Sequence, residues 1–205
     1  MFACSLAKGV REHAGSFSRA RTSTAKRHCG MVMLRCGHSL LQRVKTPVED
    51  MSSSGTLGDW YARAIFAKPQ QLVLCTNEVS LLSVVMPLAP ASSLPERFVV
   101  AASRRVRQIR APSELLAREV AHLRDVRIGK AVSRSVISTM NQITYSLKGW
   151  VYGGGSGNLE ELGLFLSDIP FTSISKTWPW HQAEFALTGS VAQEGIGWKV
   201  QANVL

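Results

Sequence analysis

Acidic residues are nearly missing from the start of this chain, and long apolar runs are missing from all of it. Residues 1–32 contain six lysine and arginine residues but only one acidic residue, Glu12. They also lack the apolar segment of a secretory signal peptide. The most apolar stretch, Leu81 to Ala91, contains two prolines and is too short to cross a bilayer. We therefore expect neither a secreted nor a membrane-bound protein.

Cysteine is also scarce, with 4 residues in 205. A chain of this length with so few cysteines is not a disulfide-stabilised scaffold, and we expect reduced thiols in a cytoplasmic protein. His28, Cys29, Cys36 and His38 lie close together in the sequence. Their spacing does not match that of zinc sites, so we expect no metal and no cofactor.

The sequence has no complete catalytic motif. The glycine-rich stretch from Gly153 to Asn158 misses the dinucleotide pattern because an asparagine holds its last position. Gly129 and Lys130 lack the hydroxyl residue of a phosphate-binding loop. The sequence leaves an enzymatic role open but favours a non-enzymatic one, and no catalytic residue is assigned.

What is present is the composition of an ordinary globular protein, with 45% hydrophobic and 19% charged residues. We expect a basic, disordered leader over residues 1–32, which a start at Met31 or Met33 would place outside the natural protein. A single domain is expected over residues 33–188. Residues 189–205 are expected to form a loosely ordered tail.

Three apolar runs between residues 60 and 86 are separated by short turn-forming stretches. Lys68–Gln70 and the pair Asn77 and Glu78 are typical of turns. Short connections between apolar strands favour an antiparallel meander. Further short strands are expected at Met33–Cys36, Val126–Ile128 and Leu162–Leu166.

Helical spacing of apolar residues predicts helices over 94–109, 113–124 and 135–150. Ser93 and Glu96 have the spacing of a capping box, and Pro179 suits the first turn of a last helix. The predicted fold is therefore α+β, with a small antiparallel β-meander sheet packed against three or four helices.

Four stretches carry a resemblance to a known family. The chain resembles a bacterial family of small proteins known only as a domain of unknown function, over about three quarters of its length. The family has no established activity, so the resemblance implies none here. The last stretch is the most specific, although Ser138 stands where relatives usually have glycine. The stretches are Met-Leu-Arg-Cys (33–36), Leu-Gly-Asp-Trp-Tyr-Ala (57–62), Gln-Leu-Val-Leu-Cys-Thr-Asn-Glu (71–78) and Ser-Arg-Ser-Val-Ile-Ser-Thr-Met-Asn (133–141).

The strongest candidate for a ligand site is the start of the helix near residue 134. Lys130 and Arg134 flank the point where Ser135 opens this helix. Unpaired N–H groups and the helix dipole attract anions there, and a guanidinium can grip phosphate or carboxylate. Asn141 lies off the apolar stripe and can present its amide to the same ligand. The structural alternative is that these groups cap the helix and pair with neighbouring residues.

Trp60 and Asn77 complete the candidate site, if the fold brings them into one cleft with Arg134. The predicted function is a cytoplasmic, non-catalytic binding or regulatory module that recognises an anionic group or a partner protein. Two alternatives stay open. One is an enzyme acting on a phosphorylated or nucleic-acid substrate, with Asp59 or Glu78 as the acid or base.

The other alternative is nucleic-acid binding. The segment 104–134 contains nine arginine and lysine residues but only three acidic ones. Few aromatic residues lie between these charges, so stacking on single-stranded bases is not indicated. The whole chain has a formal net charge of +10, half of which comes from residues 1–32.

Overall fold

Three consecutive strands form an antiparallel meander, because their connections are too short for any other arrangement. They are β2 (Trp60–Ala67), β3 (Gln70–Asn77) and β4 (Ser83–Pro87). In the register, Trp60 lies opposite Asn77, and Thr76 lies opposite Ser83. This is a computed structural model, and it describes residues 30–191. The predicted meander is confirmed.

Two further strands extend the sheet on the side of β2. β1 (Val32–Cys36) pairs in parallel with β2, and β5 (Val126–Lys130) pairs in parallel with β1. The strand order is β4-β3-β2-β1-β5, so the sheet is mixed and not purely antiparallel as predicted. The α+β class is confirmed. The parallel pairs join distant segments, and no turn in the sequence marks them.

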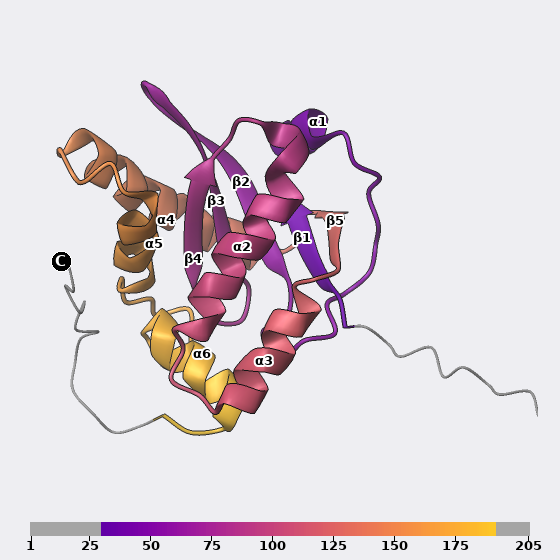
Figure 1. Cartoon of the computed structure of the whole chain (residues 1–205). Coiled ribbons are helices and arrows are strands. Elements are labelled where there is room, and N and C mark those ends of the chain that lie inside the picture. Colours follow the sequence, from indigo (N-terminus) through magenta and orange to yellow (C-terminus); the bar gives the residue numbers. More distant parts are fainter. Residues whose placement is uncertain (1–29, 192–205) are drawn as a thin grey trace, which may run out of the picture.

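Helices cover both faces of this sheet, which gives three layers (Figure 1). The first face packs against α1 (His38–Val44), α2 (Leu94–Arg107), α3 (Ser113–His122) and α6 (Pro179–Thr188). The second face packs against α4 (Arg134–Tyr152) and α5 (Leu159–Ser167). A short 3-10 helix, η1 (Ala91–Ser93), leads into α2.

Alternation along the strands divides the core between the two faces. On β2, Trp60 points to the α2 side and Tyr61 to the α4 side. All five residues of β1 are buried, because both of its faces are covered.

Two local predictions are wrong. Residues 162–166 belong to α5 and do not form a strand. A short apolar run does not distinguish a strand from a buried helix, and here Asn158 caps a helix by accepting the N–H of Glu160 at 3.0 Å. The Ser93 side chain makes no capping bond, because its hydroxyl donates to Pro90 O and accepts from Arg97 Nε.

Most of the predicted leader and tail lies outside the described residues. In residues 30–191, no helix has both the length and the apolar character that a bilayer-spanning segment needs.

Candidate functional site

Lys130, Arg134 and Ser135 lie where predicted, around the first turn of α4. All three are exposed, with Lys130 at the end of β5 and Arg134 as the first residue of the helix. Ser133 caps α4, since its hydroxyl accepts the N–H of Val136 at 3.4 Å. The Arg134 side chain makes no hydrogen bond or ion pair within residues 30–191, so solvent surrounds it.

Two of the other three predicted residues, Asn141 and Asn77, have polar groups that already bond within the protein. Asn141 accepts a hydrogen bond from Arg63. Asn77 is buried and donates to Leu57 O at 2.7 Å. Trp60 packs edge-on against Phe98, on the opposite face of the sheet from α4. The fold therefore does not bring the six residues into one cleft.

Asp59 and Glu78 anchor a loop. Asp59 forms a buried ion pair with Arg35 and accepts the N–H of Ser53 at 2.8 Å. Glu78 accepts the N–H of Asp59 at 2.9 Å. The remaining nitrogens of Arg35 donate to carbonyl oxygens of the loop before β2 and of Lys130. The hydrogen bonds of these carboxylates all lie within this network, and none reaches Arg134.

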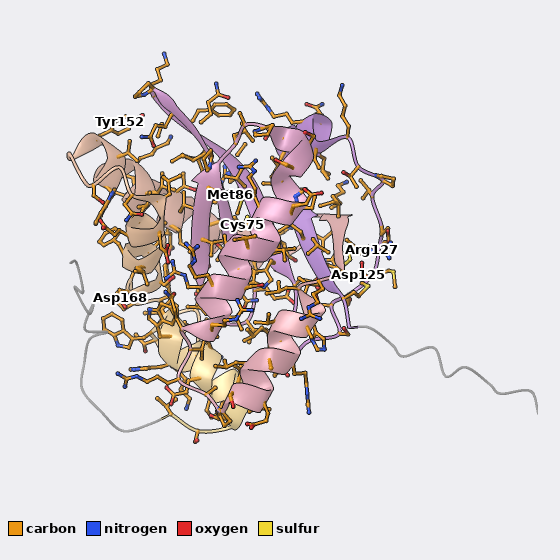
Figure 2. The ribbon with its side chains drawn as sticks, viewed as in Figure 1. Cys75, Met86, Asp125, Arg127, Tyr152 and Asp168 are labelled. Atoms are coloured by element: carbon orange, nitrogen blue, oxygen red, sulfur yellow. The ribbon has the colours of Figure 1, made fainter. Side chains whose placement is uncertain are left out.

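The side chains of the basic segment 104–134 do not converge on one surface. Arg127 on β5 is paired with Asp125, which lies just before that strand (Figure 2), and with Glu49. Arg107 and Arg124 instead line a groove of about 540 Å³ between α2 and α3, together with Arg104. The Arg105 side chain points toward the edge of the sheet at β4.

At this edge, α5 packs directly against the last strand. The Ser83 N–H donates to the Ser167 hydroxyl at 3.1 Å, and that hydroxyl also bonds to Ser83 O. A helix that satisfies the backbone of an edge strand prevents further strand pairing there. Beyond Ser83, residues Val84 to Pro87 of β4 line a cavity together with the start of α5.

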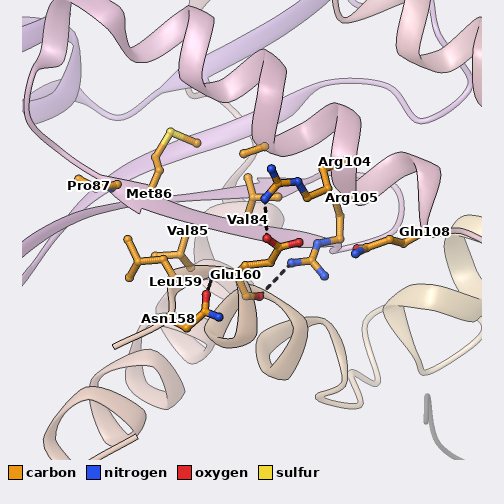
Figure 3. Close-up of a pocket in the computed structure, with 11 residues that line it drawn as sticks. Val84, Val85, Met86, Pro87, Arg104, Arg105, Gln108, Asn158, Leu159 and Glu160 are labelled. Atoms are coloured by element: carbon orange, nitrogen blue, oxygen red, sulfur yellow. Dashed lines mark hydrogen bonds and ion pairs between the residues drawn. The ribbon is translucent and has the colours of Figure 1, made fainter. Parts of the chain in front are cut away.

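This edge cavity has a volume of about 290 Å³ and lies between β4, α2 and the start of α5 (Figure 3). Its wall combines apolar residues, mostly from β4, with polar groups from α2 and the start of α5. The lining residues are Val84, Val85, Met86, Pro87, Ala101, Arg104, Arg105, Gln108, Asn158, Leu159 and Glu160.

Arg105 is the buried charged group of the edge cavity. The residue is only 3% exposed, and its Nε and Nη1 atoms have no hydrogen-bond partner in the described part of the chain. Only Nη2 donates, to Glu160 O at 3.3 Å (Figure 3). The Glu160 carboxylate pairs with Arg104 instead. Buried guanidinium nitrogens normally find partners, so this arrangement is unusual for a folded protein.

The surroundings of Arg105 do not neutralise it. Burial lowers its pKa to about 10, although the charges of Glu160 and Asp168 act in the opposite direction. The group therefore stays charged at neutral pH. Its guanidinium carbon lies 5.4 Å from the centre of the Trp180 ring, a cation–π contact that stabilises the charge but supplies no acceptor.

Arg105 was predicted only as one member of the basic segment. A clearer indication is present in the sequence, because residues 98, 102, 105 and 109 follow helical spacing and place Arg105 on the buried face of α2. A charged arginine on an apolar, buried helix face is unfavourable unless it has a partner or a ligand. The helices that bury it, α5 and α6, come from much later in the chain.

Cys36 and Cys75, the cysteines within residues 30–191, are free thiols buried on the α2 side of the sheet. Burial raises the pKa of Cys36 to about 12 and raises the pKa of Cys75 as well. Both thiols are therefore protonated at neutral pH. Within residues 30–191, no three His, Cys, Asp or Glu side chains gather as metal ligands. His28 and Cys29 of the discounted zinc pattern lie outside that range.

Comparison with known proteins gives one match. No curated protein and no solved structure matches the chain. One family model does match, over residues 33–182, and this range includes the four stretches that carry the resemblance. The chain thus belongs to the family described as domain of unknown function DUF6933.

Proposed function

We propose that the protein is a non-catalytic binding module that recognises an anionic group, and that the edge cavity holds this group. The observation that carries the proposal is the Arg105 guanidinium, which is buried, charged and short of two hydrogen-bond partners. Arg105 replaces Arg134 as the centre of the proposed site, because Arg134 is exposed whereas Arg105 is buried.

The physical argument is that the unliganded site is unfavourable. A buried donor without an acceptor costs about 1–3 kcal/mol, and a buried charge without a close partner costs more. A carboxylate or phosphate in the cavity would accept from Nε and Nη1 and compensate the charge. Glu160 does not provide this, since its carboxylate already pairs with Arg104.

A cytoplasmic location is part of the proposal. Cys36 and Cys75 are free buried thiols, which supports a reducing compartment. The groove that contains Arg107 and Arg124 adjoins the edge cavity, since Arg104 and Gln108 line both. It extends the cationic surface toward any larger acidic partner that carries the bound group.

The test compares Arg105→Met with the wild-type protein by calorimetric titration at constant ionic strength. The probes are phenylacetate, as a carboxylate, and phenyl phosphate, as a phosphate. We expect at least one of them to bind the wild type, and Arg105→Met to weaken that binding at least tenfold. Arg118→Met, an exposed arginine that lines neither the edge cavity nor the adjoining groove, is the matched control and should bind normally.

Unfolding experiments on the same variants separate a binding role from a structural one. Replacing an unpaired buried charge with a hydrophobic side chain of similar volume is expected to leave the free energy of unfolding unchanged or higher. A large loss of stability in Arg105→Met would mean that the guanidinium holds the fold together. That result, or unchanged anion binding, would overturn the proposal.

A further inference from the structure

The edge cavity contains unused acceptors as well as unused donors. The Oε1 atom of Gln108 is buried and has no hydrogen-bond partner in the described part of the chain. Gln108 follows Arg105 by three residues, so the two side chains leave the end of α2 on the same side. Figure 3 shows the Gln108 amide directed toward the guanidinium of Arg105.

The backbone of β4 adds a second pair of unused groups. The N–H and C=O of Ser83 point away from β3, because both bond to Ser167 on α5. Backbone groups alternate along a strand, so those of Val85 point in the same direction as those of Ser83. Val85 lines the edge cavity, and its N–H and C=O lie on the side of the strand away from β3. Within residues 30–191, neither group has a backbone hydrogen bond to another element.

A simple anion satisfies only the donors among these groups and leaves the acceptors unpaired. It accepts from Arg105 and from the Val85 N–H, but it leaves Gln108 Oε1 and Val85 O without donors. A ligand that fills the site therefore needs a donor close to its anionic group. A neutral hydroxyl fits better than an ammonium, because Arg104 and Arg105 both line the cavity and repel a second cation. A hydroxyl also both donates and accepts, which suits an amide.

We propose that the edge cavity binds a hydroxy acid, a ligand whose carboxylate meets Arg105 and whose adjacent hydroxyl meets Gln108 and Val85. The inference rests on the proposed function and names the class of ligand for the same site. The volume of about 290 Å³ and the apolar wall formed by Met86, Pro87 and Leu159 leave space for a hydrophobic body beyond the acid group.

The test uses two acids that differ by one hydroxyl, mandelate and phenylacetate, in calorimetric titrations at neutral pH. We expect the wild type to bind mandelate about tenfold more tightly or better, because a site with buried polar groups rejects a ligand that leaves them unpaired. Gln108→Leu is expected to remove most of this preference while it leaves the affinity for phenylacetate nearly unchanged. Arg105→Met should weaken both acids.

The outcomes separate the inference from the function on which it rests. Equal affinity of the wild type for the two acids, or a preference that persists in Gln108→Leu, overturns the inference and leaves anion binding intact. Failure of both acids and of phenyl phosphate to bind overturns the proposed function as well. If Gln108→Leu does not fold, Gln108→Met provides the same test, because it also removes the amide oxygen and adds no charge.

Discussion

Arg35 and Arg105 are both buried guanidinium groups, yet their environments are opposite. All three nitrogens of Arg35 have acceptors, in Asp59, Lys130 O and Met51 O. Burial lowers its pKa, but the bond and charge of Asp59 outweigh this and raise it overall. Arg105 has one weak acceptor and a lowered pKa. The donors of the first arginine are all used within the fold, whereas the second has two donors that the proposed anion would use.

Glu78 provides a pH-dependent prediction at the scale of a single residue. Burial is the main cause that raises its pKa above the usual range, and the nearby charge of Asp59 adds to this. A raised pKa in the folded state means that folding favours the protonated form. The contribution of Glu78 is therefore fully present below its unfolded pKa and is lost as pH rises through the folded value.

We expect Glu78→Gln to be more stable than the wild type at pH 7 and equally stable near pH 3. The amide oxygen of glutamine can still accept the Asp59 N–H, so the change mainly removes the buried charge. Urea unfolding across this pH range measures the difference. A variant that is less stable at pH 7 would show that the attraction between Glu78 and Arg35 dominates.

At the scale of elements, the junction of α5 with β4 depends on a residue without a side chain. A Cβ atom at Gly163 would lie 2.8 Å from Arg105 Nη2 and 3.3 Å from Ser83 O. The glycine thus allows the helix to approach the strand and leaves space for the buried guanidinium. Gly163 also interrupts the helical pattern between two leucines. For this reason residues 162–166 resemble a short strand in the sequence.

Gly163→Ala tests this close approach. Alanine favours a helix over glycine by about 1 kcal/mol, so in open space the change would stabilise the protein. We expect destabilisation instead, because the new methyl group displaces Arg105 or the β4 backbone. Gly149→Ala on α4 is the matched control, since nothing lies within 4 Å of its Cβ position and it should stabilise. Thermal unfolding shows whether each variant is more or less stable than the wild type. A stabilised Gly163→Ala would contradict the close contact.

The elements that the sequence predicts well are those with local causes. The meander follows from its turns, and α2 and α4 follow from apolar residues at helical spacing. Pairing of β1 with β5 has no local cause, because it joins Val32 to Val126 across most of the domain. For the same reason the sequence did not single out Arg105, since Arg105 is buried by α5 and α6, which the chain reaches much later.

At the scale of the whole molecule, one sheet holds two core layers together. Successive residues of β2, such as Trp60 and Tyr61, enter different layers, so neither layer can lose its packing without disturbing the strands of the other. Domains of this size with a shared core usually unfold in one step. We therefore expect the two faces to unfold together, although their helices do not follow one another in the chain.

Leu94→Ala and Leu147→Ala test this coupling, one in each layer. Both leucines are 0% exposed, Leu94 on the α2 side and Leu147 on the α4 side. Each change is expected to cost about 2–5 kcal/mol, with the exact loss set by how far the cavity collapses. Trp60 and Trp150 lie in different layers, so tryptophan fluorescence reports on both, and far-UV circular dichroism reports on the helices. We expect one urea transition in each variant, with the same midpoint by both methods and an unchanged slope.

A separate early transition in Leu147→Ala would mean that α4 and α5 unfold while the rest of the sheet persists. In that case the edge cavity would lose α5 first, and anion binding would fail before the fold does.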